Sequence, residues 1–209
     1  MAYLARDRRR EAILNAAAEI MVTEGFRAVT ARSVAAGMGA SAGIVHHHFA
    51  SIADLVRAAW QYHTEALIEE FTEAAAGLSA EDSVELFMED LISPGRESHV
   101  QIWSDGWHEA QFDPEFAEVY ATVFRACRDC LADVIAAGRA AGAFRGDREP
   151  VASALTIVTM AMAVSGLSAV RAPLVDQAQA RTMLAELVGQ ELGYRPRWAW
   201  GLGGGSRTA

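Results

Sequence analysis

Apolar residues recur at helical spacing along the first part of the chain. Between Glu11 and Glu24 they form one stripe on a helix, made by Ile13, Leu14, Ala17, Ile20 and Met21. Gly25 follows directly, and a glycine just past an apolar stripe is typical of a helix end. The pattern therefore predicts a first helix that ends at Glu24.

Two shorter helices are predicted next, with a glycine-containing turn between them. Thr30 has the side chain of a helix cap and precedes a helix over 31–36. After a turn at 37–39, Ser41 is expected to cap a third helix that ends near His48. Two short helices joined in this way are typical of a helix-turn-helix.

The remaining chain predicts further helices and no strand. A long helix is expected from Ile52 to about Ala76, and others follow at about 80–92, 97–111, 114–141, 148–170 and 177–192. The predicted fold is therefore all-α, with about nine helices and no internal repeat. It divides into a three-helix head at 1–51, a larger helical body at 52–194 and a glycine- and arginine-rich flexible tail at 195–209.

The composition suits a helical protein with a sizeable core, because 52% of the residues are hydrophobic and 22% are charged. The most apolar stretch, 151–170, is interrupted by serines and threonines and has no basic flank, so we expect a core helix rather than a membrane span. The N-terminal residues are arginine-rich and lack the apolar segment of a secretory signal. These features predict a cytoplasmic protein without a membrane partner.

The net charge of −9 is distributed unevenly. Residues 1–60 carry seven arginines against five acidic residues, whereas residues 61–209 carry eleven against twenty-two. A basic head on an acidic body suits a protein that touches a polyanion with one end only. Chance unevenness is the alternative, so charge is supporting information here.

A helix-turn-helix restricts residue size where its two helices cross. Ala35 supplies a small residue on the first helix, Gly39 tolerates the positive φ of the turn, and Val45 supplies an apolar side chain that points back into the head. In this context the sequence resembles the N-terminal domain of the TetR family. The resemblance rests on Gly25-Phe26, Val29-Thr30, Ala35, Gly39, Ser41-Ala42-Gly43, His48-Phe49, Ser51 and Leu55.

The resemblance implies which residues touch double-stranded DNA. The helix that begins near Ser41 would enter the major groove, where the residues facing the bases would be Ala42, Gly43, Ile44, His46 and His47. The residues nearer the phosphates would be Thr30, Arg32, Ser41 and His48. Backbone N–H groups at a helix start attract phosphate, which agrees with this placement.

Two positions depart from the family pattern. Members commonly have a tyrosine at the place of His46 and a lysine at the place of Ile52. Without that lysine one phosphate contact is lost, and the salt dependence of DNA binding should be shallower by about one unit. Arginines near the N-terminus either compensate or form an ordinary solvated face; they are Arg6, Arg8, Arg9 and Arg10.

Three consecutive histidines, His46 to His48, raise the question of a metal site. Consecutive residues on a helix point about 100° apart, so three of them cannot converge on one ion, and no metal or other cofactor is expected. A second hypothesis is that protonation of these imidazoles below about pH 6.5 strengthens DNA binding.

Aromatic residues of the body are expected to line an effector cavity, which is typically apolar with few polar groups. The candidate residues are Trp60, His63, Phe87, Leu91, Trp103, Trp107, His108, Phe124, Thr159 and Met162. Ordinary core packing is the alternative for each of them. A cationic effector would suit aromatic rings beside carboxylates, and an uncharged lipophilic one is also open.

The body resembles the branch of the family typified by the choline-responsive repressor of betaine synthesis, without transferring a ligand. The resemblance rests on Trp103, Trp107, Ala110, Asp113-Pro114-Glu115, Gly138, Gly142 and Phe144-Arg145.

The last two helices are expected to join two subunits into a homodimer. Their apolar stripes consist of Ala154, Leu155, Val158, Ala161, Met162 and Ser165 on one helix and Met183, Leu184, Leu187 and Val188 on the other. Such helices can form a four-helix seam across a two-fold axis, or they can complete the core of the body itself. A dimer would place two recognition helices about 34 Å apart on a palindromic operator.

The predicted function is that of a DNA-binding repressor, which a small-molecule effector releases from its operator. An enzyme is not expected, because no nucleophile elbow, phosphate loop or paired metal-ligand motif occurs. A helical interaction module without DNA is a further alternative. Cys127 and Cys130 lie one helical turn apart without further ligands and are expected to be structural thiols rather than a redox trigger.

Overall fold

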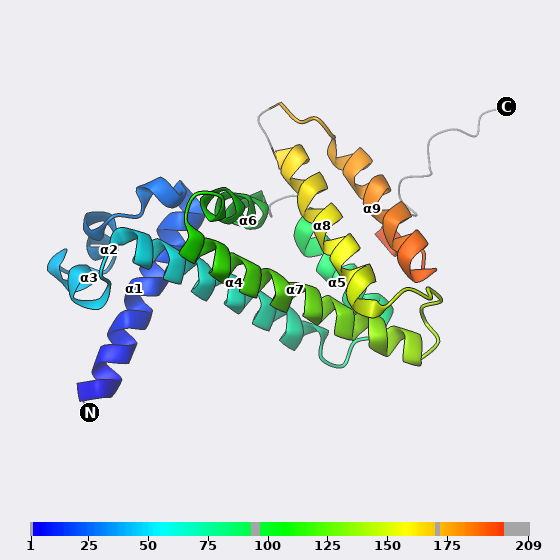
Figure 1. Cartoon of the computed structure of the whole chain (residues 1–209), viewed down its shortest axis with the longest axis horizontal. Coiled ribbons are helices and arrows are strands. Elements are labelled where there is room, and N and C mark those ends of the chain that lie inside the picture. Colours follow the sequence, from blue (N-terminus) through cyan, green and yellow to red (C-terminus); the bar gives the residue numbers. More distant parts are fainter. Residues whose placement is uncertain (1, 93–96, 170–171, 199–209) are drawn as a thin grey trace. The chain divides into compact units, whose positions relative to one another are not determined.

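The computed structural model describes residues 2–92, 97–169 and 172–198, and within them the chain forms nine α-helices and no strand (Figure 1). The elements are α1 (Ala2–Glu24), the short 3-10 helix η1 (Phe26–Ala28), α2 (Ala31–Gly37), α3 (Gly43–His48), α4 (Ile52–Ala75), α5 (Ala80–Ile92), α6 (Glu97–Ala110), α7 (Pro114–Ala140), α8 (Pro150–Ala169) and α9 (Gln177–Leu192). The expected all-α class is confirmed. Except at the start of α1, the predicted helix bounds lie within two residues of the observed ones.

The described chain divides into two compact units. The first runs to Leu67 and includes Gln101–Val123, and the second consists of Ile68–Val100 and the chain from Phe124 onward. The first unit therefore contains α1, α2 and α3 together with parts of α4, α6 and α7. Each unit has buried apolar residues of its own.

Helix α1 packs its apolar stripe into the first unit, where Ile13, Leu14, Ala17 and Met21 are buried. The helix begins at Ala2, nine residues before the expected start at Glu11. Arginines are good helix formers, and those that precede Glu11 add no apolar stripe. A search for apolar periodicity therefore misses this part of the helix.

Helices α2 and α3 form the predicted helix-turn-helix. Thr30 caps α2 in a reciprocal pair with Ser33: the Ser33 N–H donates to Thr30 Oγ1 at 3.0 Å, and the Thr30 N–H donates to Ser33 Oγ at 2.9 Å. Gly39 has a φ of +62°, the left-handed conformation expected in the turn. Val34 and Val45 are buried, so one apolar side chain from each helix holds the motif together.

The expected cap of α3 by Ser41 is wrong. The helix begins at Gly43, its N-cap is Ala42, and no side chain caps it. Ser41 contributes its carbonyl oxygen, which accepts the Ile44 N–H at 3.0 Å. Because Ala42 already has helical dihedrals, with φ −58° and ψ −26°, the chain enters α3 through a turn closed by backbone groups.

The second unit is built on the packing of α8 against α9, with α5 in contact with both. Ile157, Val158, Leu184 and Val188 are fully buried in it. Among the described helices, α8 is long and apolar enough to cross a membrane over Pro150–Ser168. The core helix of a soluble helical protein meets the same criterion, so this property is weak evidence for a membrane span.

The chain that follows α9 returns to α5 through polar contacts. Buried Glu85 accepts hydrogen bonds from the Tyr194 hydroxyl at 2.5 Å and from the Arg197 N–H at 2.6 Å, and the Arg197 guanidinium pairs with Asp82 at 2.5 Å. Burial, followed by the bond to Glu85, raises the pKa of Tyr194, so its phenol stays protonated. Arg197 thus packs against α5, although it falls in the segment expected to be a tail, and residues 199–209 lie outside the described part of the chain.

Candidate DNA interface and effector site

Helix α3 is held by two buried side chains and exposes most of the others. Val45 and Phe49 are both buried, and the Phe49 N–H donates to the Val45 carbonyl at 2.9 Å. The residues expected to face bases lie at the surface: Ala42, Gly43, His46 and His47 are exposed and Ile44 is half-buried. The small residues at the start of α3, Ala42 and Gly43, leave little side-chain bulk between this helix and an approaching duplex.

The residues expected near phosphates also lie at the surface of the first unit. Thr30 and Arg32 are exposed at the start of α2, Ser41 is exposed before α3, and His48 is half-buried at its end. The structure therefore brings these predicted positions together around the two short helices.

His48 lies in a positively charged environment. Its pKa is lowered below the ordinary value of 6.5, first by burial and then by the charges of His47, Arg6, Arg10 and Arg9. The imidazole is therefore uncharged at neutral pH. Among the described residues no group of histidines, cysteines and carboxylates could hold a metal ion.

An aromatic cluster forms where α4, α6 and α7 meet in the first unit. Trp60 is fully buried, and its ring centroid lies 5.5 Å from Trp103, 5.3 Å from Phe116 and 5.3 Å from Tyr120. Trp103 meets Trp60 edge to face, whereas Tyr120 stacks on it with 20° between the rings. The indole N–H of Trp60 donates to the Ile102 carbonyl at 2.9 Å. Sequence reasoning included Trp60 and Trp103 and missed the two rings from α7.

Close packing of α6 on Trp60 depends on Gly106. A Cβ at this position would lie 2.5 Å from Nε1 of Trp60, which is far closer than real contacts allow. Gly106, rather than the adjacent Trp107, therefore faces the cluster. Trp107 is 62% exposed, and the exposed His108 has its ring 5.1 Å from Phe112. The structure thus separates Trp107 and His108 from the buried rings.

The remaining effector candidates divide between the two units. His63 is half-buried in the first unit. In the second unit Phe87 is buried, Leu91, Phe124 and Met162 are half-buried, and Thr159 is exposed. Phe87 meets Phe71 edge to face at 5.3 Å.

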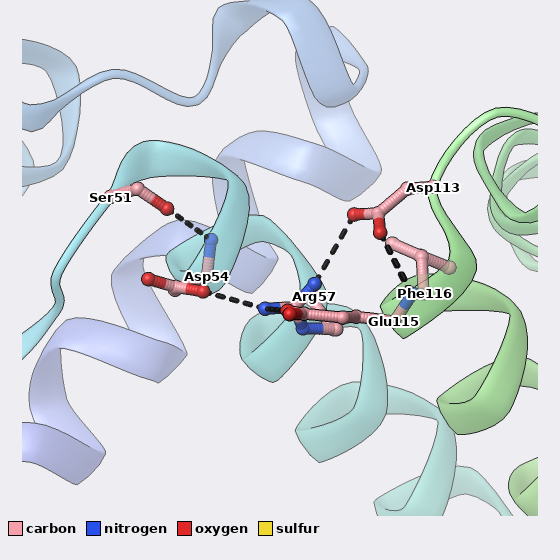
Figure 2. A network of polar contacts seen from close by, with 6 residues as sticks. All are labelled: Ser51, Asp54, Arg57, Asp113, Glu115 and Phe116. Carbon is pink, nitrogen blue, oxygen red and sulfur yellow. Dashed lines mark hydrogen bonds and ion pairs between the residues drawn. The ribbon is translucent and has the colours of Figure 1, made fainter.

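Arg57 forms a network of ion pairs in the first unit (Figure 2). Its guanidinium lies 2.6 Å from the Asp54 carboxylate on the same helix, 3.2 Å from Asp113 and 2.5 Å from Glu115. Asp113 also accepts the N–H groups of Glu115 and Phe116, so it caps α7 while it pairs with α4. The network therefore connects the N-terminal part of α4, which follows the helix-turn-helix in the sequence, to the start of α7. Sequence reasoning missed this network, although an aspartate before Pro114 is a recognisable cap signal.

The apolar stripe expected at the dimer seam is largely buried within the second unit. Ala154, Val158, Ala161 and Ser165 are covered by the chain itself. The large apolar residues that are exposed on α8 and α9 are Val151, Leu155, Met160, Leu167 and Met183, and of these Leu155 and Met183 belong to the expected stripe. Most residues of the predicted stripe are therefore wrong as dimer contacts. The prediction failed because α8 is apolar on more than one face, and its sequence does not show which face the chain itself covers.

The geometry of the first unit, with an exposed α3 beside a capped α2, defines a helix-turn-helix regulator. The family model described as bacterial regulatory proteins of the tetR family matches residues 13–59, and the model described as BetI-type transcriptional repressor, C-terminal, matches residues 80–193. The chain belongs to the TetR family of transcriptional regulators. Regulators of this family bind operator DNA and dimerise. No curated protein matches the sequence.

Solved structures with the same fold include several regulators. A TetR-family regulator from Rhodococcus is 24% identical, with a TM-score of 0.71 over 85% of this chain and 95% of that one. A regulator from Saccharomonospora viridis in complex with choline is 19% identical, with a TM-score of 0.73 over 89% of this chain and 98% of that one. The reduced form of Escherichia coli NemR is 13% identical, with a TM-score of 0.72 over 90% of this chain and 99% of that one. At these identities the likeness shows the fold.

Proposed function

We propose that this protein is a homodimeric repressor that leaves a palindromic operator when a small molecule binds to it. The exposed surface of α3, anchored by Val45 and Phe49, is the observation that carries the proposal. The bases would be contacted by Ala42, Gly43, Ile44, His46 and His47, and the phosphates by Thr30, Arg32, Ser41 and His48.

Dimerisation through α8 and α9 is supported by their exposed apolar side chains. Leu155 and Leu167 lie on α8, and Met183 lies on α9. Two such helices from each subunit would bury these residues across a two-fold axis. The same symmetry would present two α3 helices to successive turns of the major groove, about 34 Å apart.

The effector is proposed to be a small quaternary ammonium compound. Trp60, Trp103 and Tyr120 gather in one cluster, and aromatic faces attract such cations. Choline occupies the regulator from Saccharomonospora viridis, which has the same fold. The proposed binding residues are Trp60 and Trp103, which the sequence also predicted, with Tyr120 added, and the exposed Trp107 lies apart from them. An uncharged lipophilic effector is the second candidate, because the same rings are also apolar.

The dimer would leave its operator if the effector binds better to a conformation in which the distance between the two helix-turn-helix heads does not match successive major grooves. Helix α4 begins directly after the helix-turn-helix and carries both Arg57 and Trp60, so a shift of α4 would reach the head. Effector and operator then weaken each other's binding by the same factor.

The test uses full-length protein and a duplex that it selects from a randomised library. We expect salt-dependent binding by fluorescence anisotropy, and weaker binding when choline is added at millimolar concentration. Trp103→Leu should reduce the choline response more than Trp107→Leu, because only Trp103 joins the buried cluster. Selection of no duplex would refute the DNA-binding role. Operator binding without any response to choline would remove the ammonium assignment and leave the regulator assignment intact.

A further inference from the structure

Helix α1 carries its arginines on a regular helix that leads into the head. Arg6, Arg8, Arg9 and Arg10 are all exposed and all helical. Figure 1 shows the N-terminal turns of α1 extending beyond the part that packs with α2 and α3. These side chains are therefore held on a rigid support.

Helical geometry separates one of these arginines from the other three. Successive residues turn by about 100°, so Arg6 and Arg10 lie roughly 40° apart and Arg9 lies about 60° to the other side of Arg6. Arg8 points about 160° away from Arg6 on the same basis. The buried Ile13 and Leu14 follow Arg9 and Arg10 by four residues each, so the three arginines continue the face that packs into the head.

Contacts with α3 agree with this direction. The guanidinium carbon of Arg10 lies 5.0 Å from the ring centroid of Phe49, which directly follows α3. The charges that act on His48 are those of His47, Arg6, Arg10 and Arg9. Arg8 is absent from that set. Arg10 therefore lies against the end of the recognition helix, and Arg6 and Arg9 continue the same face of α1.

This face is strongly positive and available to a partner. Residues 41–48 contain no carboxylate. Within the described residues, Arg6 and Arg9 form no ion pair, and Arg10 engages the Phe49 ring. Exposed guanidinium groups bind phosphate through paired N–H donors.

We propose that Arg6, Arg9 and Arg10 form a second phosphate-binding surface beside α3, which extends the contact with operator DNA past the helix-turn-helix. The proposal rests on the proposed function. Contacts to phosphates do not distinguish one base sequence from another, so this surface would add affinity rather than specificity. It would also supply positive charge that is missing at the start of α4, where Ile52 stands in place of a basic residue.

The experiment measures the slope of log Kd against log KCl concentration for full-length protein on the duplex it selects. For Arg6→Ala/Arg9→Ala/Arg10→Ala the slope should become shallower by at least about 1.8, which is one phosphate contact on each of two heads at about 0.9 per contact. Arg8→Ala, on the same helix and equally exposed, is the matched control and should leave the slope unchanged. Arg6→Lys/Arg9→Lys/Arg10→Lys should restore most of the slope, because the charge is kept.

A second variant tests whether the triple substitution acts only by removing the contact between Arg10 and Phe49 and thereby altering the helix-turn-helix. Arg6→Ala/Arg9→Ala keeps Arg10 over Phe49 and should still flatten the slope, with unchanged thermal melting. Shortening the duplex at both ends should remove the difference between this variant and wild type. Equal slopes for the triple variant and Arg8→Ala would overturn the proposal while leaving the regulator assignment standing. A wild-type protein that selects no duplex would instead count against the proposed function.

Discussion

Two regions of the molecule are rich in apolar side chains, but only one of them is covered by the chain itself. The cluster around Trp60 in the first unit is buried, whereas the outer face of α8 and α9 in the second unit, defined by Leu155, Leu167 and Met183, is exposed. Trp60 is covered on several sides by rings and its indole N–H is bonded within the chain. Leu155 and Met183 are 44% and 43% exposed. Apolar groups that are buried stabilise the fold of one chain, whereas a row of exposed ones is stabilised by a partner. The two regions should therefore respond differently to substitution.

The largest effect is expected at the buried cluster. Trp60→Ala should lower the free energy of unfolding by about 3–5 kcal/mol, because it leaves a cavity and removes the hydrogen bond from the indole N–H to the Ile102 carbonyl. Urea unfolding followed by circular dichroism measures this loss. Trp107→Ala, at an exposed position of α6, should cost no more than about 0.5 kcal/mol. Similar losses for both variants would break the distinction between covered and exposed rings.

At the outer face, substitution should alter association before it alters folding. Leu155→Glu should raise the dimer dissociation constant at least about tenfold, equivalent to about 1.4 kcal/mol, since the face would meet its own copy and bring two carboxylates together. Sedimentation velocity across a range of protein concentrations checks this. Leu174→Glu changes another exposed leucine outside α8 and α9 and should leave the dimer intact. Equal dissociation constants for the two variants would show that these exposed residues of α8 and α9 are not the dimer seam.

The ion pairs of Arg57 should give an intermediate effect on stability. Arg57→Met should cost about 1–2 kcal/mol, because it leaves Asp54, Asp113 and Glu115 close together without their shared cation. Arg128→Met should cost less than about 0.5 kcal/mol, since Arg128 pairs with the adjacent, exposed Asp129. Chemical denaturation compares the two. Partial recovery in Arg57→Met/Asp113→Asn would support the repulsion between carboxylates, and no recovery would argue against it.

The smallest effect concerns pH. His48 is uncharged at neutral pH because burial lowers its pKa, and protonation at lower pH adds charge at the end of α3. Operator affinity at fixed KCl should therefore rise as the pH is lowered from 7 to 5, because each head gains a positive charge near the phosphates, and His48→Gln should reduce that rise. The unfolded chain takes up this proton more readily, so His48 also makes stability fall over the same range. Equal affinities at both pH values would contradict the expectation.

Local signals in the sequence predicted the head well. The Thr30 cap and the positive φ of Gly39 depend on neighbours within a few residues, so their types alone point to the conformation. The side-chain cap at Ser41 failed because Ala42 already has helical dihedrals and the Ser41 carbonyl, rather than its hydroxyl, accepts the Ile44 N–H. The capping of α3 depends on neighbouring backbone dihedrals, which the residue types at these positions do not determine.

Features that depend on a distant partner were beyond the sequence. Trp103 and Trp107 are one helical turn apart, and only the position of Trp60 against Gly106 decides which of them is buried. The Arg57 network joins α4 to Asp113, which is 56 positions away, so nothing in the local pattern around Arg57 identifies its partners on α7.

The contacts made after α9 set a lower limit on useful chain length. Glu85 accepts hydrogen bonds from the Tyr194 hydroxyl and the Arg197 N–H, and both donors belong to residues that follow α9. A protein shortened to Gly193 would retain every α-helix that the structure describes, yet it would lose both hydrogen-bond donors of Glu85. Purification tags are therefore better fused beyond residue 198, and helix boundaries alone are a poor guide to trimming this regulator for crystallisation.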